Sequence, residues 1–293
     1  MDRDFPKGKQ LKIAMVIDCY DDSKNGAVIS TKRFVELLKK DNHIVSVITT
    51  GAPAPGKILL PKFYPFGMKR IMKRMHTPLA FPSRKILRRT IKENDIIHVQ
   101  FPFFLAINSI KVARHLYIPV VTTFHIQAEH LAINAGIHSE KFILYCYKFW
   151  IKHIYNKSDM VICPSKFAED ELHMYGLKSP SIIVSNGFLP IFKPMKVDRD
   201  DQLKDKFIIL SVGRLAPEKR HELIIQAINK SRFREKIQLI LIGEGPLKGK
   251  LVETGSVLTN SPIFLSLSPE ELVYYYNVSD LYIHAATVEV ECM

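Results

Sequence analysis

The chain has 293 residues, of which 47% are hydrophobic and 24% are charged. This balance excludes a disordered chain, and the length suits about two globular domains. No apolar run approaches the ~20 residues that cross a bilayer, and the opening residues, MDRDFPKGKQ, lack the apolar core of a signal peptide. Four cysteines lie far apart without paired spacing, so we expect no metal site and a cytoplasmic location.

Strand-like and helix-like segments alternate over the first two thirds of the chain. Apolar runs predict strands at 12–18, 44–50, 95–101, 119–125, 159–165 and 181–187. Helical spacing between them predicts helices at 30–40 and 140–157. Because several of the strands are apolar throughout, we expect them to be buried on both faces, as in a parallel sheet.

The alternation stops at a proline-punctuated and then charged stretch, 189–206, which predicts a linker. It restarts with a short helix from Pro269 and with strands at 207–213, 237–245, 261–267 and 280–286. The pattern predicts the α/β class, with two Rossmann-like doubly wound parallel-sheet domains. We place the first domain at 1–188 and the second, which we expect to be incomplete, at 207–293.

The formal net charge of +13 is concentrated in one region. Residues 57–92 contain eleven Lys or Arg and no Asp or Glu, with Phe63, Phe81 and other large apolar residues interleaved. A solvated basic face is one explanation. An anionic membrane surface is the other, since it attracts such segments with about 1 kcal/mol per basic residue. Nucleic acid is a weaker third candidate.

Polar and glycine residues collect where the predicted strands end. In open parallel sheets ligands bind outside the carboxyl ends of the strands, so this pattern predicts a cleft lined from both domains. The residues at these ends are Asp18, Gly26, His98, Gln100, His125, Ser165, Asn186, Gly187, Arg214, Gly243, Gly245 and Glu289.

The segment SVGRLAPEKRHELIIQAI, at 211–228, places two cations between a strand and a predicted helix. A helix start binds phosphate through its unpaired backbone N–H groups, and Pro217 suits its first turn. Arg214 and Lys219 add two full charges, which suits a diphosphate better than a single phosphate. A chance surface pair is the alternative. Neither a P-loop nor a dinucleotide fingerprint is present.

This segment resembles the signature turn of the retaining glycosyltransferases of family four, which have the two-domain GT-B fold. Further segments are similar to that family and follow in its order: DCYDDSKNGAVISTKRFVELLKK, TTFHIQAEH, KSDMVICPSKFAEDEL, IIVSNGF, LILIGEGPLKGKL and SPEELVYYYNVSDLYIHAATVEVE. The resemblance covers nearly the whole chain.

The resemblance implies catalytic roles for four residues. Arg214 and Lys219 would hold the donor diphosphate, with Gly26 close to the same phosphates. His125 would face the transferred sugar, although it could also be a buried structural histidine. Glu289 would bind hydroxyl groups of the sugar.

The same resemblance implies a nucleotide-sugar pocket. Gly243, Gly245 and Pro246 would shape it, although the two glycines could simply serve the turn. Asn186 belongs to the predicted donor site, and Glu291 competes for the role of the first glutamate.

These roles imply transfer of a hexose from a nucleoside diphosphate sugar, with uridine as the expected base, to a lipid or glycan acceptor. The resemblance implies retention of configuration without a metal or other cofactor. We expect a cytoplasmic protein, peripheral on the inner face of the membrane. A non-catalytic membrane-associated GT-B module and a nucleotide-sugar epimerase of similar fold remain alternatives.

The sequence departs from the family near its end. The second glutamate of the family motif would fall eight positions after Glu289, beyond Met293. We therefore expect a truncated piece of a longer enzyme that is weakly active or inactive.

Overall fold

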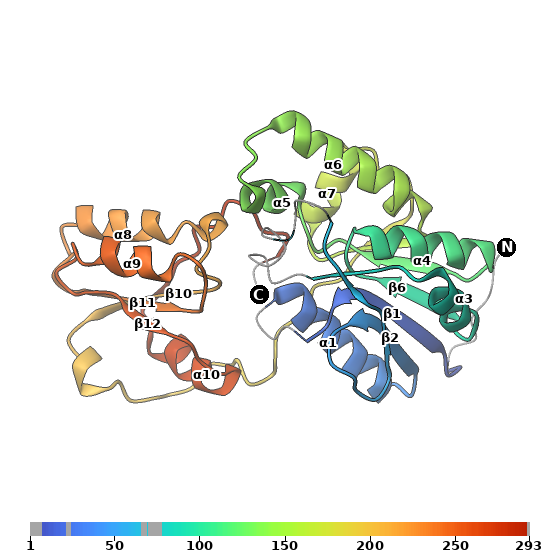
Figure 1. The fold of residues 1–293 in the computed structure, drawn as a ribbon. Coiled ribbons are helices and arrows are strands. Elements are labelled where there is room, and N and C mark those ends of the chain that lie inside the picture. The colour runs from blue at the N-terminus through green and yellow to red at the C-terminus, as the bar shows by residue number, and fades with distance from the viewer. Residues whose placement is uncertain (1–7, 22–24, 66–68, 70–77, 292–293) are drawn as a thin grey trace. The chain divides into compact units, whose positions relative to one another are not determined.

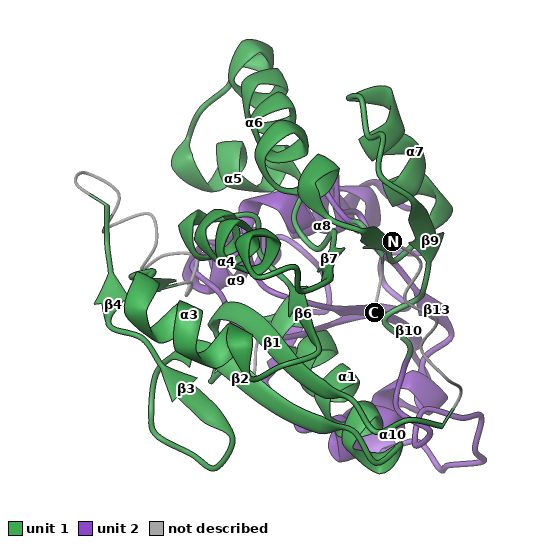
Figure 2. Cartoon of the chain, turned by 90° about the vertical axis from the view of Figure 1, so that its right-hand side faces the viewer, with its two compact units in different colours: residues 1–187, 290–293 green, residues 188–289 purple. Residues whose placement is uncertain are grey.

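The computed structural model describes residues 8–21, 25–65, 69 and 78–291. The chain divides into two compact units, shown in two colours in Figure 2. Unit 1 comprises residues 1–187 and 290–293, and unit 2 comprises residues 188–289. The last residues thus group with unit 1, whereas the sequence placed them in the second domain.

Unit 1 is built on a seven-stranded sheet in which every neighbouring pair is parallel. The strand order is β3-β2-β1-β6-β7-β8-β9. The chain first adds strands on one side of β1 and then continues on the other side with β6, which makes the space beyond these two strand ends the topological switch point. The strands are β1 (Lys12–Cys19), β2 (Ile44–Thr50), β3 (Lys57–Leu59), β6 (Ile96–Val99), β7 (Val120–Thr123), β8 (Met160–Cys163) and β9 (Ser181–Ile183).

Helices cover both faces of this sheet, as Figure 1 shows. Ile13 and Met15 of β1 pack with Val28 of α1, whereas Ala14 and Val16 face a core shared with α3, α4 and α6. Burial on both faces explains why these strands are apolar throughout. The helices are α1 (Gly26–Lys40), α3 (Arg84–Lys92), α4 (Phe104–His115), α5 (Ala128–Ala135), α6 (Glu140–His153) and α7 (Lys166–Met174), with a 3₁₀ turn, η1 (Tyr155–Lys157).

Unit 2 has a smaller parallel sheet, in the order β12-β11-β10-β13. Helices α8 and α9 pack on one face, with Ile209 and Leu239, and α10 packs on the other, with Ile208 and Leu210. The elements are β10 (Phe207–Val212), α8 (His221–Lys230), β11 (Ile237–Ile242), α9 (Lys248–Gly255), β12 (Ile263–Leu265), α10 (Pro269–Val278) and β13 (Leu281–Tyr282), with 3₁₀ turns η2 (Asp201–Leu203) and η3 (Pro217–Lys219).

The predicted α/β class with two Rossmann-like parallel-sheet domains is confirmed, and each predicted strand is present, most of them shorter than predicted. The segment 189–206 packs on unit 2, because Leu203 is buried in its core and Arg199 pairs with Asp280 at 2.6 Å. The basic segment holds short strands that were not predicted, β4 (Lys62–Phe63) and β5 (Leu79–Ala80), which form an antiparallel pair. Among the described residues, no helix is both long and apolar enough to span a bilayer.

Candidate functional site

The turn after β10 carries the two cations, but its local structure differs from the prediction. Pro217 opens the 3₁₀ turn η3 and not an α-helix, and α8 begins at His221. Arg220 between them is left-handed, with φ 51°, which interrupts helical hydrogen bonding. Arg214 and Lys219 therefore lie in a loop ahead of α8 and not inside its first turn.

Lys219 is held in place by an acidic partner within unit 2. Its ammonium group forms an ion pair with Glu289, and the two side chains are 18% and 30% exposed. The backbone N–H of Thr287 donates to the carbonyl of Glu218 at 3.0 Å, which ties the segment before Glu289 to the cationic turn. The candidate diphosphate-binding lysine and sugar-binding glutamate are thus brought together.

A histidine that the sequence analysis did not single out completes this cluster. His284 Nε2 lies 3.5 Å from Oε2 of Glu289. Burial raises the pKa of Glu289, but His284 and Lys219 outweigh burial and hold that pKa below its usual value. Burial, with Lys219 and His284 nearby, lowers the pKa of the neighbouring His221 to about 4. The signal in the sequence was an imidazole within the largely apolar run DLYIHAA.

The two glycines of the loop after β11 allow it to pack backbone against backbone on the cationic turn. A Cβ atom on Gly243, whose φ is 147°, would lie 2.0 Å from the carbonyl oxygen of Gly213. One on Gly245 would lie 2.3 Å from that of Leu215. The close packing of the two loops therefore explains why both positions require glycine. Pro246, which follows Gly245, is exposed.

In unit 1, Gly26 is the first residue of α1, close behind the end of β1. The side chain of Asn25 caps this helix by accepting from the backbone N–H of Ala27 at 3.0 Å. The start of α1 follows one of the two strands that flank the switch point, which is the place where doubly wound sheets bind phosphates.

His125 is half-buried after β7 and its ring is fixed by a second polar side chain. Its Nε2 lies 2.9 Å from Oε1 of Gln100, which also accepts from the hydroxyl of Thr31 at 3.3 Å. His98 Nε2 bonds to Thr123 Oγ1 at 2.7 Å. Burial, reinforced by His98, lowers the pKa of His125 to about 3, and burial lowers that of His98 to about 4. Both rings are therefore neutral at physiological pH, and His125 donates from Nε2 to Gln100.

Asn186 lies in a different part of the predicted donor site. Its backbone N–H and its Nδ2 both donate to Oε2 of Glu291 at 2.8 Å, and the hydroxyl of Ser30 donates to its Oδ1. Glu291 thus belongs to a network of unit 1. Of the two glutamates between which the sequence could not choose, only Glu289 contacts Lys219.

Asp18 is the penultimate residue of β1, and its side chain is buried. Its Oδ1 accepts from the backbone N–H of Ala80 at 2.9 Å. Burial raises the pKa of Asp18 to about 7, and the bond from Ala80 offsets only part of that effect. In the parts of the chain that the structure describes, no three His, Cys, Asp or Glu side chains are arranged to hold a metal ion.

Comparisons with known proteins agree with this architecture. The model of Glycosyltransferase Family 4 matches residues 24–188, and that of Glycosyl transferases group 1 matches residues 195–293. The chain is 26% identical to the alpha-monoglucosyldiacylglycerol synthase of Streptococcus pneumoniae, covering 96% of this chain and 67% of that protein. It is 24% identical to a GDP-mannose-dependent alpha-mannosyltransferase of Mycolicibacterium smegmatis, covering 96% and 75%.

Solved structures show the same fold at low sequence identity. Anabaena Alr3699/HepE, crystallised in complex with UDP-glucose, superposes with a TM-score of 0.63 at 15% identity, covering 95% of this chain and 75% of that one. A glycosyltransferase from Rickettsia africae gives a TM-score of 0.65 at 17% identity, covering 94% and 73%. With family models matching both of its halves, the chain belongs to the family-four glycosyltransferases of GT-B fold.

Proposed function

We propose that this chain transfers a hexose from a nucleoside diphosphate sugar, UDP-glucose or a close relative, to a lipid or glycan acceptor with retention of configuration. One observation carries the proposal: the turn after β10 holds Arg214 and Lys219, and Lys219 is paired with Glu289. The relatives support it through their names, which include a glucosyldiacylglycerol synthase, and through a UDP-glucose complex of HepE.

Each of the site residues has its own role in the proposed reaction. Arg214 and Lys219 stabilise the negative charge that develops on the departing diphosphate. Glu289, which its neighbours keep ionised, accepts hydrogen bonds from sugar hydroxyls. Gly26 lies close to the donor phosphates, and neutral His125 faces the sugar.

The reaction itself exchanges one bond for another at the anomeric carbon. The bond from that carbon to the phosphate oxygen breaks, and a new bond to the acceptor oxygen forms on the same face. The leaving phosphate takes the proton of the acceptor hydroxyl, so that this step requires no protein base.

The remaining predicted donor residues have supporting roles in the proposal, each within its own unit. Gly243, Gly245 and Pro246 shape the loop that receives the nucleotide. Asn186 and Glu291 form the network at the edge of unit 1. These assignments treat the donor as the substrate and require no cofactor.

The acceptor proposal rests on the basic segment 57–92, with one correction. Lys57 does not belong to a membrane-facing surface, because its side chain is 9% exposed and its ammonium group pairs with Asp21. The rings of Phe81 and Phe104 are about half exposed and both pack edge-on against Phe63, next to α3 with its exposed cations. Exposed aromatic rings beside cations favour a peripheral contact with the anionic inner face of the membrane. Arg70, Lys73 and Arg74 lie outside the described residues.

Donor binding and turnover should be measured separately on the 293-residue chain. Calorimetry with UDP-glucose, UDP-galactose and GDP-mannose identifies the donor, and Arg214→Ala should abolish binding of that donor. Incubation with the donor and diacylglycerol vesicles should yield a glycolipid whose anomeric configuration, read by NMR, matches that of the donor.

Two outcomes would favour the alternatives. Unchanged donor binding by Arg214→Ala would favour a non-catalytic module, and release of free sugar without an acceptor would favour an epimerase. Absence of binding to every nucleotide sugar would contradict the proposed function.

A further inference from the structure

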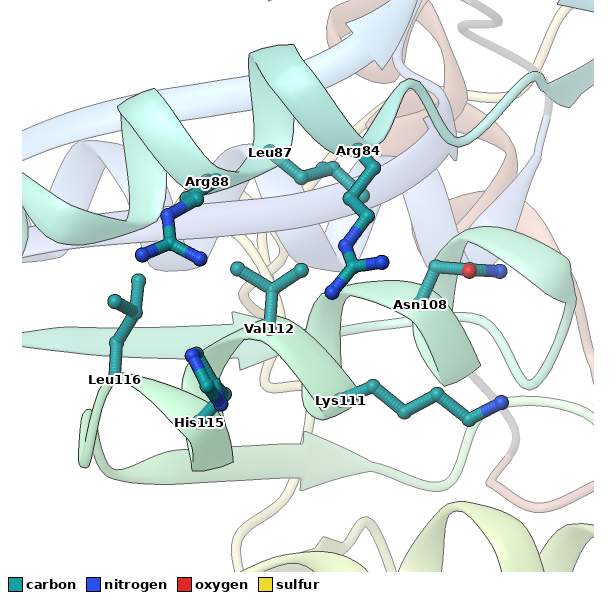
Figure 3. A pocket seen from close by; sticks show the side chains of 8 residues that line it. All are labelled: Arg84, Leu87, Arg88, Asn108, Lys111, Val112, His115 and Leu116. Carbon is teal, nitrogen blue, oxygen red and sulfur yellow. The ribbon is translucent and has the colours of Figure 1, made fainter.

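A basic pocket lies between α3 and α4 of unit 1, apart from the residues assigned to the donor (Figure 3). Its volume is about 380 Å³. Arg84 and Arg88 extend into it from α3, and Lys111 and His115 line it from α4. Its floor is apolar and includes Leu87.

Helical spacing explains how one pocket gathers four basic side chains. Arg84 and Arg88 are four residues apart on α3, and Lys111 and His115 are four residues apart on α4, so each pair shares one helix face. The buried Leu87 anchors α3 between its two arginines. Two helices therefore present their basic faces to the same space.

The positive charge of the pocket is not balanced by acidic side chains around it, because no carboxylate lines the pocket. Within the described part of the chain, no ion pair or side-chain hydrogen bond neutralises any of these four side chains. Arg84 and Arg88 are like charges four residues apart on α3, a spacing that disfavours the helix, so the pair offers no gain to folding. The cations Arg84, Arg88 and Lys111 over an apolar floor are complementary to an anion with a carbon stem.

We propose that the α3–α4 pocket binds the phosphate group of a phosphoester. Two guanidinium groups present forked donors that match phosphate oxygens, and Lys111 adds a third charge. The apolar floor, with Leu87 and Val112, accommodates the carbon stem of the ester. Ligand pockets measure about 300–1,000 Å³, so this one suits a single small head group and not an extended polymer.

If the ligand is a lipid head group, the pocket is part of the membrane contact of the proposed function, and the proposal rests on that function. If the ligand is a soluble phosphoester, the proposal does not depend on it. The phosphoester could be the head group of an anionic phospholipid or a soluble metabolite. Because the cations are exposed, binding in either case should weaken with rising salt.

A pair of matched variants separates the pocket from its basic surroundings. Arg84→Gln/Arg88→Gln removes the two arginines of the pocket. Lys85→Gln/Arg89→Gln removes the same charge at the same spacing from the same helix, but from exposed positions that do not line the pocket. Circular dichroism melts should first show that both variants keep the wild-type fold.

Two probes then test the site at low ionic strength. Glycerol 3-phosphate is titrated calorimetrically, and sedimentation is measured with vesicles of phosphatidylcholine containing one quarter phosphatidylglycerol, against phosphatidylcholine alone. For glycerol 3-phosphate we expect the pocket variant to bind at least about fivefold more weakly and the matched variant to stay within about twofold of wild type. For vesicles both variants lose charge from the basic segment, and we expect the pocket variant to lose at least about fivefold more affinity than the matched variant. Lys111→Gln/His115→Gln should repeat the loss from the other helix.

Each result decides the proposal. Pocket-specific loss of glycerol 3-phosphate binding without vesicle binding assigns a soluble phosphoester, and pocket-specific loss of vesicle binding assigns a lipid head group. Equal losses in the two matched variants, or no binding of either probe by the wild-type chain, overturn it. Because none of these measurements involves a nucleotide sugar, they can fail while the proposed transferase function holds, and the reverse.

Discussion

The ammonium group of Lys219 and the carboxylate of Glu289, 70 residues apart in the chain, form an ion pair within unit 2. Both side chains are mostly buried, so each would be costly to leave without its partner. In the proposed function, the pair fixes the cation assigned to the diphosphate and the carboxylate assigned to the sugar hydroxyls. Preorganisation of this kind is what electrostatic catalysis requires.

Replacing Lys219 by Ala should damage both activity and stability. Loss of one group that stabilises charge in the transition state should lower kcat/KM by about 10²- to 10³-fold. The partly buried Glu289 would lose its partner, which should lower the free energy of unfolding by about 2 kcal/mol. Steady-state kinetics and calorimetric melting check the two effects.

The control for this change is Lys230→Ala, which removes an exposed lysine from the last turn of α8. It should change kcat/KM less than about twofold. In the Lys219→Ala/Glu289→Gln double variant, removal of the unpaired charge should restore part of the stability but not the activity. A Lys219→Ala chain with normal donor turnover would rule out the assigned role.

His284 should act by positioning and ionising Glu289. His284→Ala removes a group that lowers the pKa of Glu289, so that pKa should rise because burial then dominates. The acid limb of the kcat/KM profile should therefore shift to higher pH, and kcat/KM should fall most on the acid side of the profile. His284→Gln, which retains an N–H donor, should recover most of the loss. An unshifted acid limb in His284→Ala would show that the histidine is merely structural.

Much of the fold could be predicted because its signals are local. Strand β11 is buried along its whole length, so a run that is apolar except for Gln238 sufficed to identify it. The helix from Pro269 begins with a local signal, the Ser268–Glu271 capping box. The short strands β4 and β5 could not be predicted. Each has two residues, and their pairing depends on contacts across the chain.

The residues of the candidate site could be predicted from the sequence, but the contacts between them could not. The charges of Arg214 and Lys219 stand out in the sequence, whereas the pairing of Lys219 with Glu289 depends on the fold of unit 2. The start of α8 was misplaced because the left-handed conformation of Arg220 has no signal in a residue that usually prefers helix. The hydrogen bond between Gln100 and His125 could not be predicted, because it depends on the positions of the segments that follow β6 and β7.

Gly243 should tolerate no side chain. In Gly243→Ala the new Cβ would meet the carbonyl oxygen of Gly213 at 2.0 Å, and the backbone φ of 147° is itself unfavourable for alanine. We expect a loss of about 3 kcal/mol or more from the stability of unit 2, with a matching loss of donor binding. Scanning calorimetry and donor titration measure both.

Gly249→Ala is the matched control. Gly249 lies in α9 with open space around its Cβ position, so alanine should stabilise the helix by up to about 1 kcal/mol. Equal destabilisation by the two substitutions would contradict the close packing of the two loops as the reason for Gly243.

Asp18 should make the stability of unit 1 fall as pH rises. Its pKa is about 7 in the folded chain and 3.8 for an unperturbed aspartate, so between these values the folded state binds more protons than the unfolded state. The free energy of unfolding should therefore decrease through this window, by roughly 4 kcal/mol from this group alone. His98 and His125, whose pKa values burial lowers to about 4 and about 3, act with the opposite sign between those values and the usual value of 6.5.

Asp18→Asn isolates the carboxylate, because its Oδ1 can still accept from Ala80 while the titration is lost. The histidine contributions are common to both proteins and cancel in the difference. That difference, variant minus wild type, should grow in favour of the variant from pH 4 to pH 7 and then level off. Trp150, the single tryptophan, is buried in α6 of unit 1, so its fluorescence during urea unfolding reports on the unit that contains Asp18. Parallel stability curves for the two proteins would show that folding does not raise the pKa of Asp18, and that burial does not govern it.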